Sequence, residues 1–246
     1  SRSGGNQGIG FSVPINLARY VMERLVTDGK VTRGYLGVII QPVTPDLAKE
    51  FKLPENTGAL VGEVTPDSPA QEAGLKEGDV IVEFNGKKVT DSRHLRLMAS
   101  QTPPGTKVPV KVLREGKEQT FTVKLGELEP EKLAKAGRSS GGLRRESAAD
   151  PLDGVTVDDL DSRSRSRLGI PANVRGALVV EVDPDCPAAE AGLRPGDVII
   201  EINRQRITNA DEAIAASEKV KGDRVLLRVY SGGGSRYIVI NAAKRR

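Results

Sequence analysis

One stretch of this sequence occurs twice, and the repeat constrains the fold more than any other feature. Residues 58–90 read GALVGEVTPDSPAQEAGLKEGDVIVEFNGKKVT, and residues 176–208 read GALVVEVDPDCPAAEAGLRPGDVIIEINRQRIT. The copies align without a gap at a constant offset of 118 residues, and 21 of the 33 aligned positions are identical. Such a repeat indicates two copies of one structural unit. The chain has 246 residues, enough for two domains of about 100 residues that each bury a modest core.

Within each copy, the residues predict short strands that alternate with short helices. The apolar runs 59–61 and 177–180 favour buried strands. A short helix follows in each copy, and Gly74 and Gly192 are suited to end it in the left-handed conformation. Each copy then continues through a further strand, a second helix and a closing hairpin. The sequence therefore predicts an α+β fold.

Composition and charge exclude several classes of function. Aromatic side chains make up only 3% of the chain, and basic residues alternate with acidic ones, so nucleic-acid binding is not expected. The one cysteine, Cys186, and the one histidine, His94, cannot form a zinc site of the usual kind. The glycines at 232–234 precede no GK[ST] motif and indicate a hairpin turn instead of a phosphate loop. We therefore expect no metal and no cofactor, and no apolar run approaches the ~18 residues of a transmembrane segment.

Three kinds of segment carry a resemblance to a known family. Residues 68–89 and 186–207 share the pattern PA…AGL…GD.I…N, residues 8–14 read GIGFSVP, and residues 33–38 read RGYLGV. The repeated pattern resembles bacterial PDZ domains. The other two segments are similar to the last strand of the trypsin-like protease domain and to the junction into the first PDZ domain in HtrA-type (DegP/DegQ-like) serine proteases. The resemblance covers nearly the whole chain.

The resemblance implies an organisation into two PDZ domains, each a small, partly open β-barrel or sandwich with two helices, preceded by a linker helix. The polar segment between them predicts that the domains fold independently and move relative to each other. The expected divisions are a remnant of the protease-domain strand at 1–13, a connecting helix at 14–32, the first PDZ domain at 33–127, a linker at 128–150 and the second PDZ domain at 151–246.

For function, the resemblance implies the peptide-binding regulatory half of a periplasmic serine endoprotease. Its expected ligands are unfolded proteins or hydrophobic C-terminal peptides, which it presents to the protease domain. In the full-length form, other subunits of a homo-oligomer are expected as further partners. The alternative is that the PDZ domains act mainly as structural contacts for oligomer or cage assembly. No catalytic residue is expected in this chain, because a nucleophilic serine needs a base and His94 falls on a predicted PDZ helix. The parent protein is implied to be a trypsin-like endopeptidase.

PDZ domains bind an extended C-terminus as an added strand beside a helix, and backbone N–H groups of the preceding loop hold its carboxylate. Leu97 and Met98 are expected to face the core. The resemblance places the peptide site of the first domain at Arg33, Tyr35, Leu36, Gly37, Val38 and Ile39, with Leu95, Arg96 and Ala99 as the helix wall.

Aligning Gly37 with Gly154 gives the corresponding site of the second domain. Its positions are Leu152, Gly154 and Val155 in the loop and Ala213, Ile214 and Ser217 on the helix. In this alignment Asp150 and Asp153 replace Arg33 and Leu36. Carboxylates near the arriving ligand carboxylate repel it, so we expect weaker peptide binding in the second domain, by about tenfold.

Overall fold

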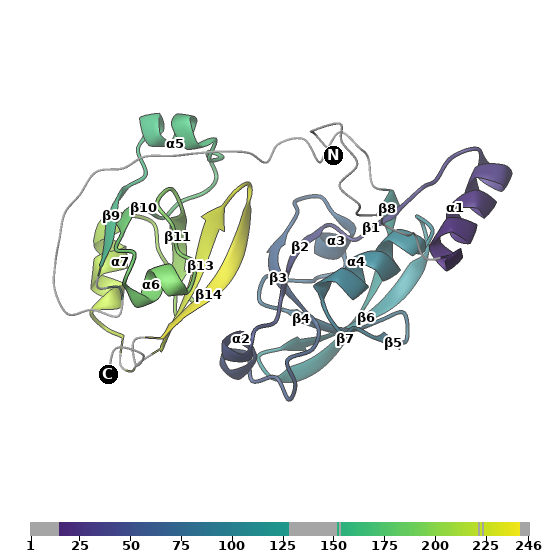
Figure 1. Ribbon diagram of the computed structural model, residues 1–246, viewed down its shortest axis with the longest axis horizontal. Helices are drawn as coiled ribbons and strands as arrows, with labels where there is room; N and C mark the ends of the chain where they lie inside the picture. The colour runs from purple at the N-terminus through teal and green to yellow at the C-terminus, as the bar shows by residue number, and fades with distance from the viewer. Residues whose placement is uncertain (1–14, 128–151, 153, 221, 223, 242–246) are drawn as a thin grey trace, which may run out of the picture.

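A computed structural model describes residues 15–127, 152, 154–220, 222 and 224–241, which form one helix followed by two α+β domains (Figure 1). The helix, α1, spans Ile15–Asp28. The predicted protease-strand segment 1–13 and the predicted linker 128–150 lie outside the described residues. Within the part that is described, no helix is long and apolar enough to cross a membrane.

The first domain is built on antiparallel strands in the order β2-β3-β4-β6-β7, with β5 paired to β4 and β1 paired to β8. Its strands are β1 (Gly34–Tyr35), β2 (Val38–Pro42), β3 (Ala59–Val64), β4 (Val80–Phe84), β5 (Lys87–Lys88), β6 (Lys107–Arg114), β7 (Lys117–Lys124) and β8 (Gly126–Glu127). Its helices are α2 (Pro45–Glu50), α3 (Pro69–Glu72) and α4 (Ser92–Gln101).

The second domain repeats this arrangement with strands in the order β14-β13-β11-β10-β9 and β12 paired to β11. Its strands are β9 (Val155–Asp159), β10 (Ala177–Val182), β11 (Val198–Ile202), β12 (Gln205–Arg206), β13 (Arg224–Ser231) and β14 (Gly234–Asn241). Its helices are α5 (Ser162–Leu168), α6 (Pro187–Glu190) and α7 (Ala210–Ser217). The common strand order confirms that the repeat encodes one α+β unit twice.

Equivalent residues shape the short helix in both copies. Ser68 caps the start of α3, with its hydroxyl accepting from the Gln71 N–H, and Cys186 caps α6, with its Sγ 3.4 Å from the Ala189 nitrogen. Cys186 is buried, so it serves here as a small capping residue. Each helix is then followed by a glycine at positive φ, as the sequence predicts.

Each domain also buries an aspartate that ties the turn before a strand to the closing hairpin. Asp79 accepts two hydrogen bonds from the guanidinium of Arg114, both at 2.7 Å, and one from the Lys76 N–H at 2.9 Å. The repeat offset maps Asp79 onto Asp197, which accepts from Arg236 at 3.0 Å. An aspartate–arginine pair therefore fastens the closing hairpin in both copies, although Arg114 comes from β6 and Arg236 from β14.

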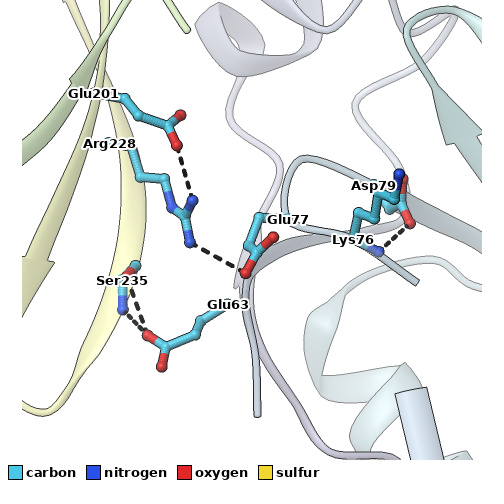
Figure 2. Close-up of polar contacts among 7 residues, drawn as sticks. All are labelled: Glu63, Lys76, Glu77, Asp79, Glu201, Arg228 and Ser235. Atoms are coloured by element: carbon cyan, nitrogen blue, oxygen red, sulfur yellow. Dashed lines mark hydrogen bonds and ion pairs between the residues drawn. The ribbon is translucent and has the colours of Figure 1, made fainter. Parts of the chain in front are cut away.

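The two domains contact each other through β14 (Figure 1). The side-chain amide of Gln41 donates to the carbonyl of Tyr237 at 2.9 Å and accepts from its N–H at 2.7 Å. Glu63 accepts from both the N–H and the hydroxyl of Ser235, as Figure 2 shows. Because β14 is an edge strand, these bonds satisfy backbone groups that would otherwise stay open to another chain.

An apolar cluster underlies these polar contacts. Its buried members are Leu47, Phe51, Leu60 and Val80 from the first domain and Leu226 and Tyr237 from the second. The rings of Phe51 and Tyr237 pack edge to face, with their centroids 5.3 Å apart. Above the cluster, Arg228 lies between Glu201 at 2.9 Å and Glu77 at 3.5 Å (Figure 2). Separating the domains would expose this surface to water, so the structure does not fit the expectation of independently moving domains.

Tyr237 makes this contact sensitive to alkaline pH. Burial, the largest cause, raises the pKa of its hydroxyl from 10.0 to about 12. The folded chain therefore keeps the proton more tightly than the unfolded chain, so stability is full below pH 10 and falls as pH rises through 12. We expect a loss of about 2–3 kcal/mol in unfolding free energy across that window. Urea unfolding at a series of pH values should show this loss, and Tyr237→Phe should make the unfolding free energy nearly independent of pH between 10 and 12. An equally steep loss in the variant would contradict the assignment to Tyr237.

Candidate functional site

Both sheets have one edge strand that lies next to a helix. Among the described residues, β2 pairs only with β3 and β9 pairs only with β10, so the outer edge of each strand is open. Helix α4 contacts β2, and helix α7 contacts β9. An open edge can accept an added strand through main-chain hydrogen bonds. Both domains therefore offer the backbone geometry for binding an extended peptide.

In the first domain, the loop before β2 is fastened through its carbonyl groups. The Leu36 carbonyl accepts from the Ala70 N–H at 2.9 Å, and the Gly37 carbonyl accepts from the Thr65 N–H at 2.9 Å and the Ser68 hydroxyl at 3.2 Å. The N–H groups of Leu36 and Gly37 have no acceptor within the described part of the chain. Successive N–H groups of this kind form an anion-binding nest.

Gly37 is required by this geometry. Its φ is +84°, and a Cβ at this position would lie 2.2 Å from the Cβ of Ser68. The loop therefore approaches the start of α3 more closely than a side chain allows.

The other loop residues surround the nest. Arg33 is exposed and has no hydrogen-bond or ion-pair partner among the residues that the structure describes. Tyr35 and Val38 are half-buried, and Ile39 is 40% exposed. The exposed Arg33 thus precedes, in sequence, a loop with two available N–H groups and an open strand edge.

Helix α4 is turned differently from the expectation. Leu97 is 44% exposed, so the prediction that it faces the core is wrong, while Met98 is half-buried against the core. Leu95 is 1% exposed and packs in the core with Ala99, and Arg96 is exposed. Their predicted role as a ligand wall stays a prediction. Leu95 and Ala99 are four residues apart and so share one face of the helix, which this structure turns inward.

Sequence reasoning missed a second face of the same helix. His94, Met98 and Gln101 are all half-buried and follow the spacing i, i+4, i+7, which places them on one side. Met98 packs against the same core cluster as Val38 and Ile40 of β2. The His94–Met98 spacing was the signal in the sequence that could have identified this face.

The second domain has an equivalent loop around Gly154. The φ of Gly154 is +84°, and its carbonyl accepts from the Asp183 N–H at 2.7 Å. The Val155 N–H is used internally, donating to the Leu152 carbonyl at 2.9 Å. On α7, Ala213 and Ser217 are buried and Ile214 is exposed. The predicted repelling carboxylates, Asp150 and Asp153, lie outside the described residues.

A further bond distinguishes the second site. The Asp159 carboxylate, at the end of β9, accepts from the Ala210 N–H at the start of α7, at 2.9 Å. This bond joins the strand edge to the helix at the end of the site away from Gly154. An extended peptide passing between β9 and α7 would have to break or avoid it.

Known proteins show the same organisation. One PDZ-domain model matches residues 34–125 and another matches residues 178–230. The probable periplasmic serine endoprotease DegP-like of Chlamydia trachomatis is 40% identical over 242 residues, which cover 98% of this chain and 46% of that protein. The protein of the same name from Ectopseudomonas mendocina is 40% identical over 247 residues, covering 99% of this chain and 50% of that protein. The chain thus spans about half the length of the curated relatives it matches.

Solved structures of proteases are also similar. The HtrA-type protease AlgW with a decapeptide is 40% identical, with a TM-score of 0.47, covering 53% of this chain and 40% of that chain. The serine endoprotease from Yersinia pestis is 35% identical, with a TM-score of 0.40, covering 50% of this chain and 40% of that chain. From the two domain matches and the sequence identities, the chain contains two PDZ domains in tandem and matches DegP-like serine endoproteases along nearly its whole length.

Proposed function

We propose that this chain is the peptide-binding regulatory part of a periplasmic HtrA-type serine endoprotease. In this proposal the first PDZ domain captures hydrophobic C-termini or unfolded segments of misfolded envelope proteins and presents them to the protease domain. The observation that carries it is the loop at Leu36 and Gly37, whose carbonyls are engaged while its N–H groups remain available beside the open edge of β2. The periplasmic location is taken from the names of the relatives.

The proposed binding mode follows from the same contacts. A peptide strand pairs with the outer edge of β2, and its terminal carboxylate accepts from the Leu36 and Gly37 N–H groups with Arg33 nearby. Its last side chain then lies beside Val38 and Met98, which form an apolar surface on the core cluster. Burial of that side chain adds to the affinity, so a hydrophobic C-terminal residue is preferred.

The second PDZ domain is proposed to bind peptide more weakly. The Asp159–Ala210 bond closes the far end of the site. The carboxylates of Asp150 and Asp153 predicted near the loop oppose an incoming carboxylate as well.

The chain is not proposed to catalyse proteolysis. Its one histidine, His94, lies on α4, and its Nδ1 is 3.1 Å from the hydroxyl of Thr90. A serine nucleophile needs a histidine base within hydrogen-bond reach and a carboxylate that orients it. The proteolytic activity belongs in this proposal to a part of the parent protein outside this chain.

Assembly is a second candidate function, favoured by helix α1. Ile15, Met22, Leu25 and Val26 are exposed apolar residues of this helix. An exposed apolar face of this kind is typical of a surface that contacts another domain or subunit. The structural role predicted for the homo-oligomer therefore stays open beside peptide binding.

The test is a titration of the whole chain with one peptide ending in Val or Phe, prepared as the free acid and as the amide. We expect the acid to bind about tenfold more tightly, because a charge near the carboxylate at an effective dielectric of ~20 contributes about 1–2 kcal/mol. Arg33→Asp should remove most of that preference. Arg206→Asp, an exposed position in the second domain, is the matched charge control. Equal affinity for acid and amide would overturn the proposal.

A further inference from the structure

The β13–β14 hairpin of the second domain lies along the first domain's candidate peptide site. Gly234, at the start of β14, is so close to Ile39 that a Cβ there would lie 2.5 Å from Ile39 Cδ1. Three residues further on, Tyr237 is hydrogen-bonded to the side chain of Gln41. The hairpin therefore follows β2 from Ile39 to Gln41.

Side chains of β2 alternate between two faces. Val38 and Ile40 pack on the core of the first domain, whereas Ile39 and Gln41 contact β14 on the opposite face. A peptide added to the edge of β2 has the same alternation. If its last side chain lies on the core side with Val38, its penultimate side chain lies on the outer face beside Ile39, facing the hairpin.

The chemistry of this outer face is apolar with an acidic end. Ile39 is 40% exposed and pairs across the strands with Glu63. Oε2 of Glu63 accepts from Ser235 of the hairpin, whereas Oε1 has no hydrogen-bond partner within the described residues. A long basic side chain fits this arrangement, because its stem can cover Ile39 while its charged end reaches the carboxylate.

We propose that the hairpin of the second PDZ domain completes the peptide site of the first, forming with Ile39 and Glu63 a subsite for a Lys or Arg at the penultimate position. This inference rests on the proposed peptide binding by the first domain. The hairpin holds the Glu63 carboxylate through Ser235 and shields it from water, so the subsite exists only while the domains are docked. By linkage, a peptide that fills it also favours docking.

Gly62 provides the variant that separates the domains. It lies in β3, its φ is not in the left-handed region, and a Cβ there would lie 2.3 Å from the backbone oxygen of Ser235. Gly62→Ala should therefore push the hairpin away without straining the first domain's own backbone. Small-angle X-ray scattering of the whole chain should show an increased radius of gyration. Gln119→Ala, at an exposed position of β7, is the control.

Binding is measured with three peptides that share a C-terminal Val and differ only in a penultimate Arg, Ala or Glu. We expect the wild-type chain to bind the Arg peptide about threefold to fivefold more tightly than the Ala peptide, and the Glu peptide most weakly. In Gly62→Ala the three affinities should converge, while the preference for free acid over amide persists. Glu63→Gln should also remove the Arg preference, without relying on separated domains.

The outcomes distinguish this subsite from the underlying peptide site. A wild-type chain that binds the three peptides equally, or an Arg preference unchanged in both variants, overturns the subsite while leaving the proposed function in place. Loss of any difference between acid and amide in the wild-type chain overturns both, because no terminal carboxylate is then held in the loop.

Discussion

Replacing Asp79 with alanine should lower the free energy of unfolding by about 3–5 kcal/mol, the usual cost of removing one partner of a buried ion pair. The Asp79 side chain is 0% exposed and accepts three hydrogen bonds. Without it, the Lys76 N–H loses its acceptor and the Arg114 guanidinium keeps only its hydrogen bond to the Gly74 carbonyl, at 2.9 Å. Arg114 is 22% exposed, so water can partly replace the lost bonds, which favours the lower end of the range.

The equivalent residue of the second copy gives a matched comparison. Asp197 is almost as buried as Asp79, but its partner Arg236 is 35% exposed and reaches it through one nitrogen. Asp197→Ala should therefore cost less, about 1–3 kcal/mol. Urea unfolding of both variants measures this difference, because a shift in the midpoint urea concentration at an unchanged m-value reports a change in stability. An Asp79→Ala variant as stable as the wild type, or a larger loss in Asp197→Ala, would show that the pair does not stabilise the fold as argued.

This pair also marks a limit of prediction from sequence. The repeat shows Gly78 and Asp79 as a turn before a strand, and the structure has that turn. The repeat in the sequence does not show that Asp79 pairs with Arg114, which follows 35 residues later. Contacts of that separation depend on how the strands pair, and no local pattern of charges identifies them. The strands themselves were predictable because burial imposes the apolar runs.

The orientation of α4 was uncertain for a similar reason. Leu95, Leu97 and Met98 are all apolar, so the helix has more than one face that could pack inward. The choice depends on the sheet beneath it, which turns Leu95 inward and leaves Leu97 in solvent. The face of the helix beside β2 could therefore not be assigned from periodicity alone.

The contact between the domains did leave one signal in the sequence. Gly62 is aligned with Val180, the single position at which strand 59–64 differs from strand 177–182. A glycine inside a strand often marks the close approach of another backbone, and here the Ser235 carbonyl occupies that space. Gln41 and Tyr237 are 196 residues apart, so their pairing had no comparable signal.

Replacing Gly37 with alanine should weaken peptide binding by roughly 100-fold, the largest effect expected at the site. A Cβ at 37 meets both the Cβ of Ser68 at 2.2 Å and its Oγ at 2.6 Å, and φ there is +84°. The loop must move away from α3, which misaligns the Leu36 and Gly37 N–H groups. Losing two hydrogen bonds to a carboxylate costs about 3 kcal/mol, which corresponds to that change in dissociation constant.

Gly154→Ala is the matched control, because the two glycines have the same φ and a Cβ at 154 would lie 2.8 Å from the Cβ of Cys186. Both variants strain an equivalent loop, so both should lose similar stability in thermal unfolding followed by circular dichroism. Only Gly37→Ala should lose affinity in calorimetric titration with a peptide ending in Val. If Gly154→Ala loses as much affinity as Gly37→Ala, the second domain binds the peptide as well as the first. If neither loses affinity, the carboxylate is not held by these loops, because the N–H groups that would hold it have been displaced without effect.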